Sequence, residues 1–393
     1  GVDLMKGFKF AGIPAGIKKN GGKDLGLIYC EQPAVVAALF TRNKVVAAPV
    51  LLGKEKIKNG FCQAVLVNSG NANCFTGKKG IEDALSCSKI LAKSLGIEDD
   101  LVFVSSTGVI GVNLPMDKFE KEIPNIVTQL SFDHLEDFSD AILTTDTHRK
   151  VIKKNGIIEG KKFSIMGIAK GSGMIRPDMA TMLAFICSDV QISAKDLKLS
   201  LTRASAKSFN RITIDGDTST NDTLLALANN TSGVKINNFE SEEIFQKVLD
   251  NICFQLAKMV VQDGEGATKL VQIIVKGALT KEDAFKASEA IAHSNLVKTA
   301  IYGEDPNWGR IIAAAGRSGA HVVPDQMDLL FDDQPLVIKG NWMGPEAEKK
   351  TAQIMKNKEI IITLDLNLGK EQDNFLFCDF SENYVKINAE YRS

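Results

Sequence analysis

Residues 165–186 read IMGIAKGSGMIRPDMATMLAFI, and this stretch decides the fold. Two apolar runs, 165–169 and 183–186, lie on either side of a connection that contains glycine, serine and proline. Short apolar runs of this kind, bounded by glycine and proline, are typical of buried strands. The stretch therefore predicts two strands with a polar turn between them, and Thr181 lies at the head of the second strand.

The same pattern extends outward along the chain. Apolar runs rich in β-branched residues predict further strands at 64–67, 101–104, 271–275 and 359–364. Apolar residues at three- and four-residue spacing predict helices at 81–95, 194–209, 242–261 and 281–302. Because strands and helices mix through the whole length, the sequence predicts an α/β fold built as a layered sandwich. The best candidate for a domain boundary is 277–280, between a strand and a long helix.

Length and composition limit the function classes. The chain has 393 residues, which at roughly 100 to 200 residues per domain predicts two or three domains. Lys and Arg total 47, Asp and Glu total 48, and no run of five like charges occurs, so neither nucleic acid nor a membrane surface is expected as a partner. The sequence shows no basic-then-apolar leader and no apolar run near the ~20 residues of a membrane helix. A cytoplasmic location is therefore expected.

Several connections that follow apolar strands are dense in small polar residues. They lie at 68–73, 105–108, 170–173 and 215–222. A rigid scaffold would present their hydroxyls and backbone N–H groups at one rim, where binding and catalytic residues are commonly found. We therefore expect the site at this rim.

Common site motifs are incomplete in this sequence. The segment 68–79 lacks the glycine spacing of a phosphate loop, and 171–176 lacks the third glycine of a dinucleotide fingerprint. A calcium loop at 215–226 would need glycine at Thr220 and glutamate at Ala226. The seven cysteines contain no C-x-x-C pair and the four histidines no H-E-x-x-H pair, so neither a disulfide framework nor a metal site is predicted.

A threonine can act as a nucleophile without histidine or metal when it is N-terminal, because its free α-amine, with a pKa near ~7.7 to 8.0, serves as the base. Thr181 follows the small residue Ala180 and a turn shaped by glycine and proline, as such a position requires. Most threonines in this pattern simply begin a strand. From the pattern alone both interpretations stay open.

The residues KGSGMI at 170–175, Pro177 and MATML at 179–183 resemble the self-cleavage signature of the ornithine acetyltransferase (glutamate N-acetyltransferase) family of arginine biosynthesis. The similarity extends over essentially the whole chain. Seven further blocks resemble that family in its order: NSGNAN at 68–73, STGVIG at 106–111, TTDT at 144–147, DGDTSTND at 215–222, GEGATK at 264–269, DPNWGR at 305–310 and NAEYRS at 388–393.

The resemblance implies an α/β/β/α sandwich of the self-processing N-terminal-nucleophile type. Cleavage between Ala180 and Thr181 would give an α chain, 1–180, and a β chain, 181–393, that stay together as a heterotetramer. Within the β chain, 181–280 would complete the catalytic sandwich and 281–393 would form a smaller C-terminal lobe.

The resemblance also implies roles for individual residues. Thr181 would be the nucleophile that carries the acetyl group, and Thr107 and Gly108 would stabilise the oxyanion. The implied substrate-binding residues are Thr147, Lys170, Thr181, Glu265, Asn388 and Ser393. Lys170 suits a carboxylate and Glu265 an ammonium group.

The implied reaction has two half-steps. Thr181 takes acetyl from N-acetylornithine and releases ornithine, and glutamate then takes the acetyl to give N-acetylglutamate, so ping-pong kinetics are expected. No resident cofactor is required, and the resemblance leaves open whether acetyl coenzyme A is also a substrate. Two alternatives stay open: a related self-processing aminopeptidase or amidase, and a non-enzymatic small-molecule-binding protein on the same scaffold.

Overall fold

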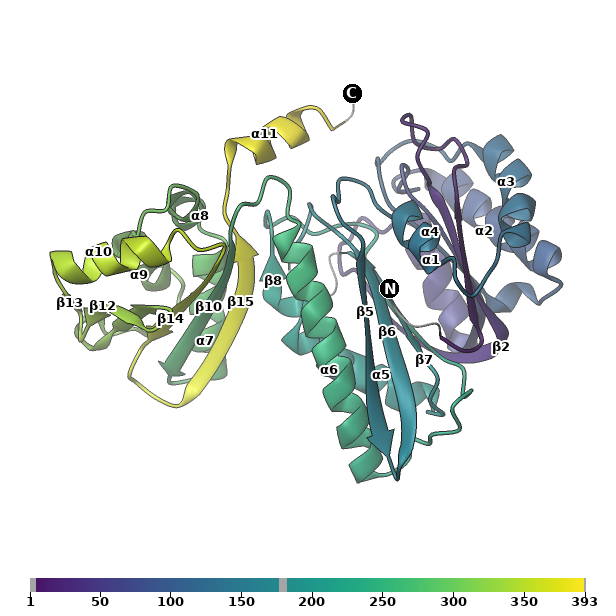
Figure 1. The fold of residues 1–393 in the computed structure, drawn as a ribbon. Coiled ribbons are helices and arrows are strands. Elements are labelled where there is room, and N and C mark those ends of the chain that lie inside the picture. Colours follow the sequence, from purple (N-terminus) through teal and green to yellow (C-terminus); the bar gives the residue numbers. More distant parts are fainter. Residues whose placement is uncertain (1–4, 177–181, 392–393) are drawn as a thin grey trace. The chain divides into compact units, whose positions relative to one another are not determined.

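The computed structural model of the protein describes residues 5–176 and 182–391, and these divide into two compact units (Figure 1). The first unit comprises Gly1–Asn210 and Asp217–Val260, and the second comprises Arg211–Gly216 and Val261–Ser393. Each unit has its own sheet and its own hydrophobic core. The two are therefore described separately.

The sheet of the first unit has eight strands in the order β4-β3-β2-β9-β7-β6-β5, with β1 added to β2. The strands are β1 (Phe8–Ile13), β2 (Leu25–Phe40), β3 (Phe61–Asn68), β4 (Val102–Ser106), β5 (Lys150–Ile158), β6 (Lys161–Lys170), β7 (Leu183–Ser188) and β9 (Thr223–Ala228). The runs that were predicted as strands at 64–67, 165–169 and 183–186 lie in this sheet. The run at 101–104 also lies in it, except for Leu101, which ends a short 3₁₀ helix.

The long strand β2 carries the sheet from one layer to a second layer. Its first half pairs with β1 and β3, and its last residues, from Val35 to Phe40, pair with β9. A register shift between Tyr29 and Ala34 separates the two halves, as expected where a bulge bends a strand. One buried cluster contains Phe103 of β4 together with Phe185 of β7, so the two halves of the sheet face each other.

Helices cover the outer faces of these two layers (Figure 1). The helices α1 (Ala48–Lys56), α2 (Gly77–Leu95) and α3 (Met116–Thr128) pack on the half formed by β1 to β4. The helices α5 (Ala194–Lys207) and α6 (Phe239–Gln262) lie on the other half. There α6 is so close to β6 that a Cβ on Gly167 would lie 2.5 Å from Leu256. This arrangement confirms the predicted α/β/β/α layering.

The second unit is a smaller α/β body with a seven-stranded sheet in the order β13-β12-β11-β14-β10-β15-β8. The strands are β8 (Ile212–Thr213), β10 (Leu270–Ala278), β11 (Asp328–Phe331), β12 (Gln334–Ile338), β13 (Asn341–Trp342), β14 (Glu359–Asp365) and β15 (Glu371–Cys378). The helices are α7 (Lys281–Ala292), α8 (Asn295–Tyr302), α9 (Trp308–Gly316), α10 (Pro345–Ile354) and α11 (Glu382–Ala389).

Two details of the second unit differ from the sequence-based expectation. The unit begins at Val261 rather than after residue 280, because β10 pairs with β14 and β15 of the C-terminal sheet. The single helix predicted at 281–302 is two helices, α7 and α8. The second helix starts afresh where the hydroxyl of Ser294 accepts a hydrogen bond from the N–H of Val297.

The remaining composition-based expectations concern cysteines and long apolar helices. All seven cysteines are buried and none forms a disulfide. Across 5–176 and 182–391, no helix combines the length and the hydropathy needed to cross a membrane.

Candidate active site

The edge of the first unit's sheet brings together strand ends that are far apart in the sequence. In one row across the sheet, Lys170 at the end of β6 pairs with Leu183 at the start of β7, and Leu183 pairs with Thr223 at the start of β9. The N–H of Thr223 also donates to the carbonyl of Met182, at 3.0 Å. Ala180 and Thr181 lie outside the described residues, and Met182 is the first described residue after them.

The turn that follows β4 carries Thr107 and Gly108. The N–H of Thr107 donates to the carbonyl of Asn68 at 3.0 Å, which fixes this turn to the end of β3. Gly108 has a φ of +136°, and a Cβ there would lie 2.4 Å from the backbone nitrogen of Asn71. The close approach of the two backbones therefore requires glycine at this position.

The side chain of Asn221 connects the two layers by hydrogen bonds at this edge. Its side-chain nitrogen donates to the carbonyl of Ala72 at 2.6 Å and to the carbonyl of Ser106 at 2.8 Å. Both contacts are buried. Asn221, two residues before β9, thus fixes the backbone just before Thr107.

Lys170 reaches from β6 to the Thr107 turn. Its ammonium donates to Thr107 Oγ1 at 3.1 Å and to Thr144 Oγ1 at 2.9 Å. The residue is only 8% exposed, so it is not an ordinary solvated lysine. Because Thr107 Oγ1 accepts from a cation, its own O–H is polarised and is a stronger donor.

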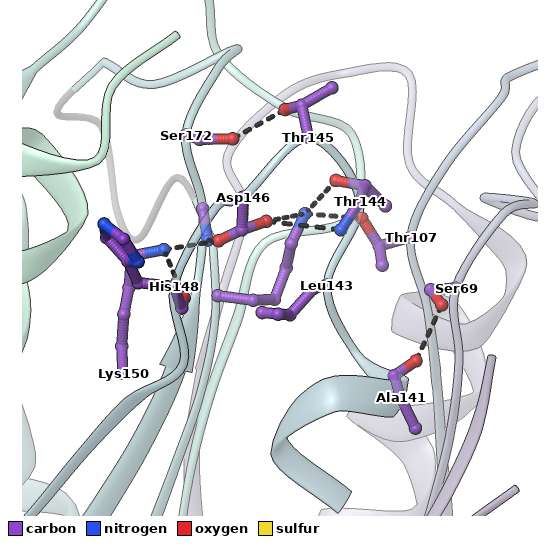
Figure 2. Close-up of polar contacts among 12 residues, drawn as sticks. Ser69, Thr107, Ala141, Leu143, Thr144, Thr145, Asp146, His148, Lys150 and Ser172 are labelled. Carbon is purple, nitrogen blue, oxygen red and sulfur yellow. Dashed lines mark hydrogen bonds and ion pairs between the residues drawn. The ribbon is translucent and has the colours of Figure 1, made fainter. Parts of the chain in front are cut away.

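Asp146 forms an ion pair with Lys150 (Figure 2) and also holds the ammonium of Lys170 in place. Its carboxylate accepts a hydrogen bond from Lys150 Nζ at 2.6 Å and from the N–H of Gly171 at 2.7 Å, and it lies 3.9 Å from Lys170 Nζ. Burial alone would raise the pKa of this carboxyl, but Lys170 and Lys150 outweigh burial and lower the pKa to about 2. Asp146 therefore stays ionised and holds the position of Lys170.

Asp222 is a second buried carboxyl at this edge, directly before β9. It is 1% exposed, and neither of its side-chain oxygens has a hydrogen-bond partner in the part of the chain that the structure describes. Burial raises the pKa of Asp222 well above its usual range. Ser219 and Lys170 are near enough to oppose this shift but do not cancel it.

The second unit contains two other predicted substrate-binding residues, and they contact each other. Glu265 is 8% exposed, and its carboxylate accepts a hydrogen bond from the side-chain nitrogen of Asn388 on α11. Ser393 lies outside the described residues. In the first unit, Thr147 is exposed and directly follows Asp146.

Within the first unit, then, the structure brings together three of the predicted site residues, Thr107, Gly108 and Lys170. The roles of Asp146, Asn221 and Asp222 were not found from the sequence. In the sequence, the feature that these three residues share is that they lie in polar blocks, 144–147 and 215–222. Polarity alone does not indicate which side chains are buried.

Among residues 5–176 and 182–391, no group of three His, Cys, Asp or Glu side chains is placed to hold a metal ion.

The fold and the site define a class of protein: a four-layer α/β/β/α sandwich whose sheet edge buries a lysine beside a Thr-Gly turn. A family model for the ArgJ family matches residues 9–393. The chain belongs to the ArgJ family.

Two relatives align over almost the full length of this chain, and one solved structure aligns over less than half of it. The arginine biosynthesis bifunctional protein ArgJ of Geobacter sulfurreducens is 47% identical over 391 residues, covering 99% of this chain and 100% of the relative. A glutamate N-acetyltransferase of Methanocaldococcus jannaschii is 46% identical and covers 100% of this chain and 98% of the relative. A crystal structure of ornithine acetyltransferase complexed with ornithine, from Mycobacterium tuberculosis, is 35% identical with a TM-score of 0.40 and covers 44% of this chain and 93% of that chain.

Proposed function

We propose that this chain is an acetyltransferase of arginine biosynthesis that moves acetyl from N-acetylornithine to glutamate. Its nucleophile is Thr181, which is exposed by cleavage of the chain between Ala180 and Thr181. Full-length similarity to proteins named glutamate N-acetyltransferase and arginine biosynthesis bifunctional protein ArgJ supports this activity.

The contact between Lys170 and Thr107 is the observation that carries the proposal. Attack on an acetyl carbonyl creates a negative oxygen, and donors that are already in place stabilise it without reorganisation. Thr107 offers a hydroxyl polarised by the Lys170 ammonium at 3.1 Å, and Gly108 adds a backbone N–H in a conformation that glycine allows. These groups form the oxyanion site of the proposed reaction.

The proposed chemistry proceeds in two half-reactions through an ester on Thr181. The α-amine of Thr181 takes the hydroxyl proton as Oγ1 attacks the acetyl carbon of N-acetylornithine, and the proton then passes to the departing ornithine amine. In the second half-reaction the amine of glutamate attacks the ester and forms N-acetylglutamate. The same oxyanion site serves both half-reactions.

Substrate recognition is assigned to groups whose charge suits an amino acid. Glu265, held by Asn388, suits an ammonium group, and Lys170 suits a carboxylate or the developing oxyanion. Thr147 and Ser393 complete the proposed binding set. The two chains 1–180 and 181–393 would stay associated in a heterotetramer in the cytoplasm. The reaction would need no resident cofactor, and acetyl coenzyme A would enter, if at all, as a substrate.

The activity is tested by mixing the purified enzyme with N-acetylornithine, with and without glutamate. Without glutamate, one equivalent of ornithine per active site is expected in a rapid burst, because the acetyl group stays on the enzyme. With glutamate, N-acetylglutamate should form as fast as ornithine. Acetate as the dominant product would favour the aminopeptidase or amidase alternative, and no product at all would favour a binding protein.

A further inference from the structure

The loop between β1 and β2 is held in one conformation by Asp24. The carboxylate of this buried residue accepts three backbone hydrogen bonds from the loop, at 2.6 to 2.8 Å, and the last of them comes from the N–H of Lys18. The carbonyl of Asp24 accepts a hydrogen bond from the N–H of Ser69 at 2.9 Å. Because Ser69 directly follows β3, Asp24 fixes the backbone of Lys18 beside the end of that strand.

The side chain of Lys18 lies close to the turn that carries Gly108. A Cβ on Gly70 would lie 3.0 Å from Lys18 Cγ, and a Cβ on Gly108 would lie 2.4 Å from the carbonyl carbon of Gly70. Lys18 and Gly108 are therefore both neighbours of Gly70. The contacts place Lys18 next to the candidate oxyanion site although it is far from Thr107 in the sequence.

The ammonium of Lys18 holds one end of a peptide group in the 141–147 segment. It donates to the carbonyl of Leu143 at 2.5 Å. The N–H at the other end of the same peptide group, that of Thr144, donates to Asp146 at 3.3 Å. Because the carbonyl accepts from a cation, the peptide group is polarised and its N–H is a stronger donor. The Leu143–Thr144 peptide is thus fixed at both ends.

This peptide group leads directly to the proposed oxyanion site. Thr144 Oγ1 accepts a hydrogen bond from the Lys170 ammonium at 2.9 Å, and the same ammonium donates to Thr107 Oγ1 at 3.1 Å. A continuous set of contacts therefore runs from Lys18 through the Leu143–Thr144 peptide and Lys170 to Thr107.

The ammonium groups of Lys18 and Lys170 are also close enough to repel each other. Burial lowers the pKa of Lys18, the carboxylate of Asp24 raises it, and the charge of Lys170 lowers it further. The Leu143 carbonyl and the Asp24 carboxylate offset this repulsion on the Lys18 side. Loss of the Lys18 ammonium would therefore change the surroundings of Lys170 as well as the position of Thr144.

We propose that Lys18 is a positioning residue for acetyl transfer: by holding the Leu143–Thr144 peptide, it fixes the Lys170 ammonium against Thr107. This inference rests on the proposed function, in which the Thr107 hydroxyl donates to the oxyanion. Oxyanion donors contribute because they are in place before the reaction, and a displacement of ~1 Å can cost ~10²-fold in rate. Lys18 thus acts through Thr107 and not on the reacting atoms.

The first test is the variant Lys18→Met, which keeps the length of the side chain but removes the ammonium. The rate of transfer from N-acetylornithine to glutamate is measured per cleaved chain, with the cleaved fraction determined by intact mass. We expect kcat to fall ~10- to 100-fold and KM to change much less, because the oxyanion forms only in the transition state. The matched control is Lys118→Met. Lys118 is exposed and donates to a carbonyl of the same loop, that of Gly16 at 2.6 Å, so this variant should keep the wild-type kcat.

The second test restores the ammonium chemically in the variant Lys18→Cys. Alkylation of the new thiol with 2-bromoethylamine gives a side chain of lysine length that ends in an ammonium. All seven native cysteines are buried, so the reagent should add one group to the folded variant and none to the treated wild type, as intact mass can verify. We expect kcat to be low before alkylation and to recover afterwards. Because one folded sample is compared with itself, a folding defect cannot produce this recovery.

The third test places Lys18→Met in the Thr107→Val background. If Lys18 acts through Thr107, it should lower kcat far less there than in the wild type, whereas a general structural role would lower both by the same factor. A wild-type kcat in Lys18→Met, equal losses in the two backgrounds, or no recovery after complete alkylation would overturn the role of Lys18. These results would leave the proposed function standing as long as the wild type forms N-acetylglutamate. A wild type that forms none would contradict the proposed function itself.

Discussion

The ammonium of Lys170 lies 3.1 Å from the hydroxyl oxygen of Thr107, although the two residues are 63 positions apart in the sequence. This contact joins the end of β6 in one layer of the sandwich to the end of β4 in the other layer. Asp146 supports the contact from the Lys170 side, and Asn221 supports it from the Thr107 side. The candidate site is therefore a junction between layers that the fold itself holds in place.

Thr107→Val tests the oxyanion role directly. The variant keeps the shape of the side chain but removes the hydroxyl donor, and loss of one such donor is expected to lower kcat by ~10²–10³-fold. KM should change much less, because the interaction belongs mainly to the transition state. Thr128→Val is the matched control, since Thr128 is exposed and its hydroxyl contacts its sequence neighbours, the carbonyl of Asn125 and the side chain of Gln129. If both variants have the kcat of the unchanged enzyme, Thr107 has no catalytic role.

Gly108→Ala tests whether the turn needs its close backbone approach. A Cβ at Gly108 would lie 2.4 Å from Asn71 N, whereas a Cβ at Gly111 would have nothing within 4 Å, although both glycines have positive φ. Gly111→Ala should cost only the conformational penalty of ~1–2 kcal/mol. Gly108→Ala should cost clearly more in urea unfolding and should also abolish activity, because the backbone must move. Equal losses of stability would show that the approach is not required.

Asp146→Asn should destabilise the protein in a pH-dependent way. The variant leaves Lys150 and Lys170 without their buried carboxylate, and breaking such a pair typically costs ~3–5 kcal/mol near neutral pH. The folded-state pKa of about 2 lies below the ordinary value, so this stability is fully present above about pH 4 and is lost as pH falls toward about 2.

Urea unfolding of the wild type and of Asp146→Asn between neutral and acidic pH measures this difference. The two unfolding free energies should converge as the pH falls. Asp140→Asn is the control, because Asp140 pairs with the partly exposed Arg149 and such pairs contribute ~0–1 kcal/mol. A difference between wild type and Asp146→Asn that does not change with pH would contradict the assigned ionisation.

Asp222→Asn should increase stability at pH 7. Burial raises the folded-state pKa of Asp222, so the folded protein binds a proton that the unfolded chain releases above about pH 4. Stability therefore falls as pH rises through this range, and the uncharged asparagine removes that loss. The gain in thermal midpoint should be largest near neutral pH and should shrink toward pH ~4, where both states of the wild type are protonated. A destabilised variant at pH 7 would indicate that Asp222 is ionised and paired.

The sequence predicts the layered fold well, because apolar strands and amphipathic helices leave a local pattern. The strands at 165–169 and 183–186 and the helix at 242–261 are all present. The break between α7 and α8 was missed, because Ser294 caps the second helix without interrupting the apolar spacing.

The site was predictable only in part. Motifs identify Thr107, Gly108 and Lys170 because these residues lie in recognisable blocks. The ionisation states of Asp146 and Asp222 depend on burial and, for Asp146, on Lys170 of another strand, which no local pattern contains. Two aspartates of similar sequence context thus have opposite pKa shifts for reasons that only the three-dimensional structure supplies.

The central claim is that Thr181, with a free α-amine, carries the acetyl group. Intact-mass analysis of the denatured protein after brief exposure to N-acetylornithine tests it most directly. We predict two fragments, the second beginning at Thr181 and heavier by one acetyl group, with the modification mapped to the Thr181 side chain, and a single unmodified full-length chain for Thr181→Ala. Cleavage or acetylation that persists in Thr181→Ala, or an acetyl group on another residue of the wild type, would contradict the claim.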